Sequence, residues 1–335
     1  MIITLKKDID GQQKQRLMQK IASCGLKAES SVTNGKVVLS LSGNTYAADT
    51  EILRAFSIVE SVKRIEDPFK LASKSFNPCG TEVSVNDVKI GKGNFCLIAG
   101  PCAIESERQI LDIAEKIKDA GANLLRGGAF KPRTSPYSFQ GLGKEGIRLL
   151  LKAKAETGMP VVSEITCASQ EDLFYDIDVV QIGARNMQNY ELIKKVGQMK
   201  KPVLLKRGIS ATVEEWLLSA EYLLTEGATD VILCERGIRT FEPTSRYTLD
   251  LSSVPVLKER THLPVIADPS HASGNARFIE PLSLAAAAVG ADGLMIEVHS
   301  QPEEALSDGA QAITPEALKL LCQKVKYILD ANKKF

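Results

Sequence analysis

From residue 95 onward, the chain alternates short apolar segments with longer amphipathic ones, eight times in succession. The apolar segments are continuous hydrophobic runs, which is typical of parallel strands that are buried on both faces. Most amphipathic segments end at a glycine, and the next strand begins after a proline or an aspartate. Eight strand–helix units in about 240 residues predict a closed (β/α)8 barrel, or TIM barrel, rather than an open doubly wound sheet.

The elements of this barrel can be bounded from the same pattern. We expect strands at 95–100, 123–128, 161–165, 179–184, 203–208, 230–237, 265–269 and 293–299. We expect helices at 107–120, 144–157, 190–198, 213–226, 278–289 and 315–331. No Gly-x-Gly-x-x-Gly motif follows the first strand, which argues against a dinucleotide-binding fold.

The first seventy residues follow a different plan. Alternation predicts strands at 1–6 and 59–65, helical spacing predicts helices at 14–21 and 50–55, and Asn34-Gly35 predicts a hairpin between 31–33 and 36–41. The resulting order, βαββαβ, is that of a ferredoxin-like domain. We therefore expect an α/β chain with a small ferredoxin-like domain at 1–66, a Pro- and Gly-containing linker at 67–80, and the barrel at 81–335. A short hairpin, 82–85 with 88–90, is expected to close the bottom of the barrel.

Composition excludes several classes of protein. The chain has 335 residues, 44% hydrophobic and 25% charged, with a net charge of +1, which is an ordinary globular balance and argues against a nucleic-acid partner. No apolar run approaches the ~20 residues of a membrane helix, and residues 1–7 lack the features of a signal peptide. The seven cysteines are odd in number, scattered and free of CxxC pairs, which argues against a disulfide framework and predicts a cytoplasmic protein.

Six cationic residues follow the predicted strands at the end where barrel enzymes place reactive groups. They are Arg126, Lys131, Arg133, Arg185, Lys206 and Arg236. One such residue is usually a solvated surface charge, but several converging on one cleft would repel each other without an anionic ligand. Arginine also suits the geometry of phosphate and carboxylate. The group therefore predicts a substrate with more than one anionic group.

A second group, Cys102, His271, Glu297 and Asp308, follows the first, seventh and eighth strands. These strands are neighbours in a closed barrel, so the four side chains can converge. One thiolate, one imidazole and two carboxylates suit a borderline divalent ion such as Mn, Fe, Co or Zn. Spacing alone leaves the structural interpretation open, since a lone cysteine is usually buried and a lone aspartate usually caps a helix.

Two lysines at strand ends, Lys131 and Lys206, also permit a Schiff-base aldolase. Such a lysine must be neutral, which favours an apolar pocket. Both lysines stand among arginines, and this favours their use as charged anion binders. A neighbouring cation can also lower the pKa of a lysine, so the Schiff-base alternative stays open.

Taken together, five motifs resemble those of 3-deoxy-D-arabino-heptulosonate 7-phosphate (DAHP) synthases. The motifs are Gly100-Pro101-Cys102, Arg126 with Lys131-Pro132-Arg133-Thr134, Gly183-Ala184-Arg185, Asp268-Pro269-Ser270-His271-Ala272 and Met295-Ile296-Glu297-Val298-His299. The resemblance is to the short microbial subfamily that shares its barrel with 3-deoxy-D-manno-octulosonate 8-phosphate synthases, and it covers the chain from about residue 67 to the C-terminus. It implies the first step of the shikimate pathway, a condensation of phosphoenolpyruvate with erythrose 4-phosphate.

The resemblance also implies roles for individual residues. Cys102, His271, Glu297 and Asp308 would bind the divalent metal ion, and a cysteine rather than an asparagine at 102 suggests that the metal is required. The residues implied for phosphoenolpyruvate are Arg126, Lys131, Arg185, Lys206 and Arg236, and those for the phosphate of erythrose 4-phosphate are Arg133 and Thr134. Lys131, Cys102, Glu164 and His271 are the candidate catalytic residues.

Two alternatives to this activity stay open. The octulosonate enzymes typically carry Lys-Ala-Asn-Arg where this chain has Lys131-Pro132-Arg133-Thr134, which favours the four-carbon sugar over arabinose 5-phosphate. A barrel that senses a phosphorylated metabolite without catalysis is the other alternative. Residues 1–66 resemble the ferredoxin-like (ACT-like) regulatory domain of related enzymes, which implies feedback inhibition by tyrosine or phenylalanine, although a role in assembly alone is also open. The family further implies a homotetramer.

Overall fold

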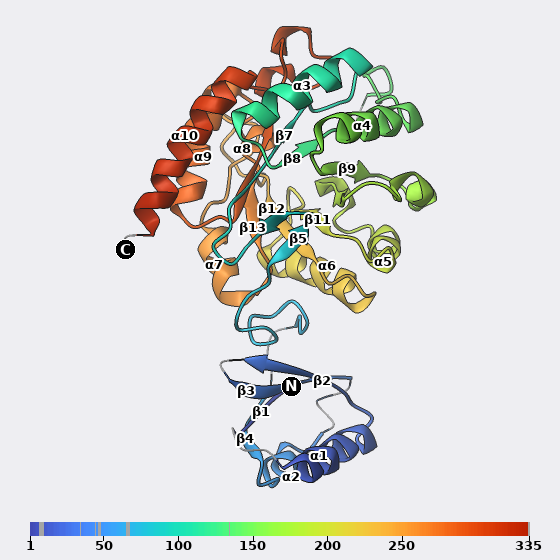
Figure 1. The fold of residues 1–335 in the computed structure, drawn as a ribbon, viewed down its shortest axis with the longest axis vertical. Helices are drawn as coiled ribbons and strands as arrows, with labels where there is room; N and C mark the ends of the chain where they lie inside the picture. The colour runs from blue at the N-terminus through green and yellow to red at the C-terminus, as the bar shows by residue number, and fades with distance from the viewer. Residues whose placement is uncertain are drawn as a thin grey trace. The chain divides into compact units, whose positions relative to one another are not determined.

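The computed structural model describes residues 1–6, 10–33, 35–43, 45, 48–64, 68–133 and 135–333. The chain divides into two compact units, Met1–Cys79 and Gly80–Phe335 (Figure 1). Each unit has its own core and is described by itself. Among the described residues, no helix combines the length and the hydrophobicity that a membrane span needs.

The first unit is a four-stranded antiparallel sheet with two helices. Its elements are β1 (Ile2–Leu5), α1 (Gly11–Ser23), β2 (Lys27–Thr33), β3 (Lys36–Ser42), α2 (Thr50–Arg54) and β4 (Val59–Lys63). The strand order is β2-β3-β1-β4, so β1 is central and pairs with β3 and β4. This is the βαββαβ order that the sequence predicts.

The core of this unit forms where α1 packs on the sheet. Leu17 and Ile21, one helical turn apart, lie in one buried cluster with Ile3, Leu5 and Leu39. The end of the predicted hairpin at Asn34 lies outside the described residues, as does Ile65 at the end of the predicted last strand.

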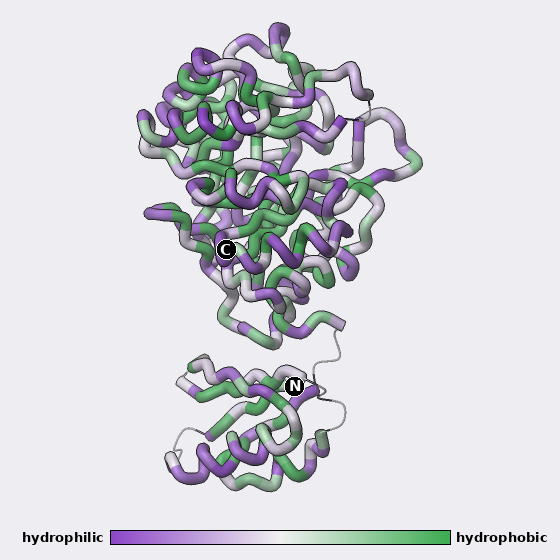
Figure 2. The backbone as a smooth tube through the Cα atoms, turned by 90° about the vertical axis from the view of Figure 1, so that its right-hand side faces the viewer, coloured by the Kyte–Doolittle hydropathy of each residue, from purple (hydrophilic) through white to green (hydrophobic). Residues whose placement is uncertain are grey.

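The second unit is a closed eight-stranded parallel barrel, which confirms the predicted fold. Its strands are β7 (Cys96–Gly100), β8 (Leu124–Arg126), β9 (Val161–Ile165), β10 (Val179–Ile182), β11 (Val203–Lys206), β12 (Val231–Glu235), β13 (Val265–Ala267) and β14 (Gly293–Glu297). The barrel closes by pairing of β14 with β7, so β13, β14 and β7 are consecutive. The hydrophobic strands fill the interior of this unit, and polar segments cover its outside (Figure 2).

Helices surround the barrel (Figure 1). They are α3 (Glu107–Ala120), α4 (Lys144–Thr157), α5 (Tyr190–Gln198), α6 (Val213–Thr225), α7 (Ser253–Arg260), α9 (Ile279–Ala288) and α10 (Pro315–Asn332). Helix α7 and the 3-10 helix η1 (Ala168–Phe174), which follows β9, are not among the elements that the sequence pattern predicts.

Six of the predicted strands extend two residues too far at their carboxyl ends, and this is a correction. The predicted strand at 265–269 shows the reason. Pro269 starts the short helix α8 (Pro269–Ser273), and the Asp268 side chain caps it by accepting the backbone N–H of His271. At this position the chain therefore leaves the extended conformation and begins a helix.

The hairpin of β5 (Val83–Val85) and β6 (Val88–Ile90) forms as predicted. Val83, Val85 and Ile90 are buried in one cluster with the interior residues of the barrel, including Cys96 and Val179 at the first positions of their strands. The hairpin thus covers the amino-terminal end of the barrel, and the carboxyl-terminal end is left for polar residues.

Candidate active site

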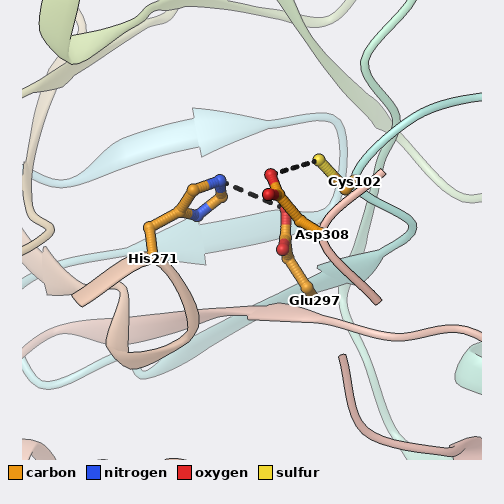
Figure 3. Close-up of side chains that lie close together, drawn as sticks. All are labelled: Cys102, His271, Glu297 and Asp308. Carbon is orange, nitrogen blue, oxygen red and sulfur yellow. Dashed lines mark hydrogen bonds and ion pairs between the residues drawn. The ribbon is translucent and has the colours of Figure 1, made fainter. Parts of the chain in front are cut away.

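Four potential metal ligands converge at the carboxyl-terminal end of the barrel. They are Cys102, His271, Glu297 and Asp308, and one ligand atom of each lies within 4.8 Å of all the others. In Figure 3 the imidazole of His271 points at Glu297, and Asp308 lies beside the thiol of Cys102. The four come from the loop after β7, from α8, from the end of β14 and from the loop after β14, as the barrel order requires.

The positions of Cys102 and Asp308 depend on unusual backbone conformations. Gly100 ends β7 with φ of +144°, and a Cβ there would lie 2.1 Å from the carbonyl oxygen of Arg126, so only glycine lets the loop to Cys102 cross so close to β8. Asp308 has a left-handed φ of 56° and begins the 3-10 helix η5 (Gly309–Gln311). Aspartate is one of the few residues that adopt this conformation readily.

The donor set fits a divalent cation. The Cys102 Sγ lies 3.1 Å from Asp308 Oδ2, and the His271 Nε2 lies 3.2 Å from Glu297 Oε1. Sulfur, nitrogen and two carboxylate oxygens, all able to offer lone pairs to one point, match the mixed ligand preference of Mn, Fe, Co or Zn.

Asp268 sets the tautomer of His271. Its Oδ2 accepts a hydrogen bond from His271 Nδ1 at 2.7 Å and another from Lys206 Nζ at 2.5 Å. Burial alone would raise the pKa of Asp268, but His271, Lys206 and these hydrogen bonds hold it well below its usual range. Burial lowers the pKa of His271, so the ring is neutral with its proton on Nδ1. The lone pair of Nε2 then faces the other three ligands, as metal-binding histidines require.

The other ligands differ in charge. Burial raises the pKa of the Cys102 thiol to about 12, so the thiol is protonated at neutral pH unless a cation displaces the proton. Burial would raise the pKa of Glu297 as well, but His271, Arg126 and Lys131 outweigh it and lower that pKa to about 2. Glu297 is therefore a buried carboxylate.

Arg126 pairs with that carboxylate. Its Nη1 lies 2.7 Å from Glu297 Oε1, and its Nη2 donates to the backbone oxygen of Cys102 at 3.3 Å. Both side chains of the pair are buried. The structure therefore places Arg126 beside two of the potential metal ligands, and it is not among the residues that line the neighbouring cavity.

That cavity of about 250 Å³ is lined mainly by cations. Its lining residues are Lys131, Pro132, Arg133, Glu164, Gly183, Ala184, Arg185, Lys206, Ile209, Arg236, Arg239, Arg246, Tyr247, His271 and Asp308. Seven of these are lysine or arginine and two are carboxylates. The excess of positive charge at one concave surface favours a ligand with several negative charges.

Five of the six cationic residues singled out in the sequence line this cavity, namely Lys131, Arg133, Arg185, Lys206 and Arg236. Glu164 lines it too. Thr134, which was predicted with Arg133 to bind the phosphate of the sugar, lies outside the described residues. Arg133 donates to the hydroxyl of Ser307, and that hydroxyl lies 3.1 Å from the Cys102 Sγ.

Sequence reasoning missed Arg239, Arg246 and Tyr247, all in the long loop after β12. The guanidinium of Arg236 lies over the ring of Tyr247, 4.4 Å from its centroid. The loop has no periodicity, and only its position after a strand end indicates that its residues could lie at the site. The neighbouring Arg207 does not line the cavity, since it pairs with Glu235 at 2.9 Å and Asp250 at 2.8 Å.

Glu164 reaches the cavity across a glycine. Its Oε2 accepts a hydrogen bond from Gln181 Nε2 at 3.0 Å, and a Cβ at Gly183 would lie 2.0 Å from its Oε1. Glycine at 183 is therefore what leaves room for the Glu164 carboxylate beside the cations.

Comparisons with known proteins give a consistent result. The DAHP synthetase I family matches residues 71–331, and the DAHP synthase ferredoxin-like domain matches residues 1–67. Phospho-2-dehydro-3-deoxyheptonate aldolase of Thermotoga maritima is 45% identical over 334 residues, which cover 99% of this chain and 98% of that protein. A 2-dehydro-3-deoxyphosphooctonate aldolase of Geobacter sulfurreducens is 33% identical over 267 residues, 74% of this chain and 97% of that protein.

Solved structures extend the comparison to three dimensions. A crystal structure of the Thermotoga maritima aldolase, also titled DAHP synthase, matches with a TM-score of 0.78 at 44% identity and covers 98% of this chain and 97% of that chain. A truncated form of 3-deoxy-D-arabino-heptulosonate 7-phosphate synthase from the same organism matches with a TM-score of 0.74 at 46% identity. It covers 78% of this chain and 97% of that chain.

Proposed function

This chain belongs to the DAHP synthetase I family, and we propose that it condenses phosphoenolpyruvate with erythrose 4-phosphate to give DAHP and phosphate, the first step of the shikimate pathway. The observation that carries the proposal is that the cluster of potential metal ligands and the cationic cavity share His271 and Asp308. A metal ion and a polyanionic substrate would therefore meet at one point. Higher identity to the heptonate aldolase, 45% against 33%, favours it over the octonate enzymes.

In this proposal Cys102, His271, Glu297 and Asp308 hold a divalent ion such as Mn, Fe, Co or Zn. When bound, the ion supplies Lewis-acid polarisation of the aldehyde oxygen of erythrose 4-phosphate. The protein contributes the neutral His271 and the buried Glu297 carboxylate, both already in the state that a ligand needs.

The cations of the cavity would bind and orient the two anionic substrates. Lys131, Arg185, Lys206 and Arg236 are assigned to the phosphate and carboxylate of phosphoenolpyruvate. Arg126, predicted for the same substrate, pairs with Glu297. Arg133 and Thr134 are assigned to the phosphate of the sugar. Holding both reactants in attack geometry can lower the barrier by about 7–11 kcal/mol, which makes positioning a major contribution.

The bond changes follow from the reactants. C3 of phosphoenolpyruvate attacks the aldehyde carbon, positive character develops at C2, water adds at C2, and phosphate leaves by cleavage of its C–O bond. Glu164 and His271 line the cavity and are the candidates for moving protons, and Lys131, which also lines it, is the candidate for stabilising the developing oxyanion. Cys102 acts through the metal ion.

The proposal is tested by following the loss of phosphoenolpyruvate absorbance with erythrose 4-phosphate or arabinose 5-phosphate. We expect turnover with the four-carbon sugar, loss of turnover after chelation, and recovery when Mn is added. Preference for arabinose 5-phosphate would place the chain with the octulosonate synthases. Turnover that resists chelation would contradict the metal assignment, and no turnover with either sugar would favour a metabolite sensor.

The first unit is proposed to carry feedback regulation. Its match to the DAHP synthase ferredoxin-like domain supports inhibition by tyrosine or phenylalanine through residues 1–66. Removing residues 1–66 should abolish inhibition and leave turnover. The measurement is the loss of phosphoenolpyruvate absorbance, with and without the amino acid, on the full and the shortened chain. Inhibition that survives the truncation would show that the effector binds the barrel.

Assembly and location belong to the same proposal. We expect a homotetramer, to be checked by light scattering on the purified protein, and a cytoplasmic location, to be checked by cell fractionation. A monomer in solution would refute the expected assembly.

A further inference from the structure

Gln311 ends the 3-10 helix η5, three residues after Asp308, and its side chain is almost fully enclosed, with 2% of the residue exposed. Both ends of its amide are engaged. Its Nε2 donates to Glu297 Oε2 at 2.6 Å, and its Oε1 accepts from Arg246 Nη1 at 2.8 Å. No role for this residue follows from the sequence motifs.

The partners fix the orientation of the amide. A carboxylate can only accept hydrogen bonds and a guanidinium can only donate them. The NH2 group of Gln311 must therefore face Glu297, and its oxygen must face Arg246, because the reverse orientation would leave both contacts repulsive.

Glu297 is in this way held from both of its oxygens. Arg126 Nη1 lies 2.7 Å from Oε1, the oxygen that also faces His271 Nε2 at 3.2 Å, and Gln311 takes Oε2. Two donors on different oxygens restrict rotation of the carboxylate about its last bond. A buried carboxylate also needs such donors, since an unpaired one is costly to bury.

Arg246 connects this contact to the substrate cavity. It lines the cavity, and its Nη1 lies 3.7 Å from Asp308 Oδ1 as well as 2.8 Å from Gln311. A continuous chain of contacts thus runs from the cavity through Arg246 and Gln311 to Glu297.

We propose that Gln311 is a positioning residue, which holds Glu297 in the orientation that a metal ion needs and links it to Arg246 at the substrate cavity. The inference rests on the proposed metal-dependent function of this site. Groups that orient metal ligands typically change metal affinity by about 10- to 100-fold when they are removed. Gln311 donates to Glu297 Oε2 at 2.6 Å and therefore belongs to this class.

The test compares metal binding in the full-length protein and in Gln311→Met, which keeps the length of the side chain and removes both hydrogen bonds. Metal affinity is measured by competition with a chromophoric chelator, and the Co²⁺-loaded protein is examined by absorption spectroscopy. We expect Mn and Co²⁺ to bind about 10- to 100-fold more weakly and the d–d and thiolate charge-transfer bands to shift. Gln311→Glu, which sets a second carboxylate against Glu297, should alter the same bands.

Gln170→Met is the matched control. Gln170 also has both ends of its amide engaged, with Thr166 and with the backbone N–H of Cys167, and it lies on η1, which contributes none of the four ligands. It should keep the metal affinity and Co²⁺ spectrum of the parent protein.

If Gln311→Met fails to fold, Arg246→Gln provides the second variant. It keeps the bond from Gln311 to Glu297 and removes the guanidinium, so we expect a smaller loss of metal affinity with a shifted Co²⁺ spectrum. Parental affinity and spectrum in Gln311→Met, or in both Gln311→Glu and Arg246→Gln, would overturn the inference. Failure of the parent protein to bind any of these ions would overturn the proposed function instead, and the inference with it.

Discussion

Replacing Asp268 by asparagine would remove the charge that organises His271. Asp268 is fully buried and accepts hydrogen bonds from Lys206, from the His271 ring and from the His271 backbone. In Asp268→Asn, an amide N–H directed at Nδ1 would favour the tautomer with the proton on Nε2. The lone pair that faces Glu297 and Cys102 would then be lost.

The size of the effect has two parts. Loss of a carboxylate that orients a metal-binding histidine costs about 10- to 100-fold in metal affinity, which corresponds to about 1.4–2.7 kcal/mol. The buried Lys206 would also lose the partner that now lies 2.5 Å away, and breaking such a pair costs about 3–5 kcal/mol of folding free energy. The two parts are separable, because the second is present in the metal-free protein.

The assay is therefore a pair of measurements on Asp268→Asn, urea unfolding without metal and chelator competition with Mn. Asp250→Asn is the matched control, since Asp250 pairs at 2.8 Å with the buried Arg207 and has no contact with His271. The control should lose stability and keep its metal affinity. The role given to Asp268 would be refuted if Asp268→Asn kept the parental metal affinity, or if Asp268→Asn and Asp250→Asn lost metal affinity equally.

Three further predictions concern the same site. Because burial raises the pKa of Cys102 to about 12, binding of a metal ion must release the thiol proton. Metal affinity measured by chelator competition should therefore rise about tenfold per pH unit from pH 7 to 9. A metal affinity independent of pH would show that the thiol is not a ligand. Arg126→Met leaves the Glu297 carboxylate without its cation and should lower the free energy of unfolding in urea by about 3–5 kcal/mol in the metal-free protein. The loss should be smaller when saturating Mn restores a positive charge. Equal losses in the metal-free and Mn-saturated protein would contradict this. Gly183→Ala should push the flexible Glu164 carboxylate out of the cavity, with about 1 kcal/mol lost in unfolding but a clear fall in kcat. An unchanged kcat would remove Glu164 from the reaction.

The sequence predicts the barrel well because its signals are local. Continuous apolar strands and amphipathic helices are visible within short windows, and barrel closure then brings Cys102 and Asp308 together. The strand at 265–267 is predicted two residues too long because Asp268 and Pro269, which start the next helix, follow the apolar run directly. Side-chain pairing across the mouth has no such local signal, which is why the burial of Arg126 against Glu297 was not foreseen.

The same reasoning applies to Arg246 and Gln311. Arg246 lies in an aperiodic loop, and its contact with Gln311 spans 65 positions along the chain. Neither residue belongs to a motif with a recognisable spacing. Such contacts emerge only from the folded arrangement of the loops after β12 and β14.

The pairing of β14 with β7 gives the site a place in the order of folding. Cys102 and Asp308 are 206 positions apart, and they meet only where the last strand of the barrel closes on the first. Joining the ends of so long a loop costs about 5 kcal/mol of chain entropy before any contact compensates. A nascent chain would thus acquire its ion only after almost all of it has been synthesised. Because the ion binds the closed barrel and not the open one, it would stabilise the pairing of β14 with β7 against opening of the barrel.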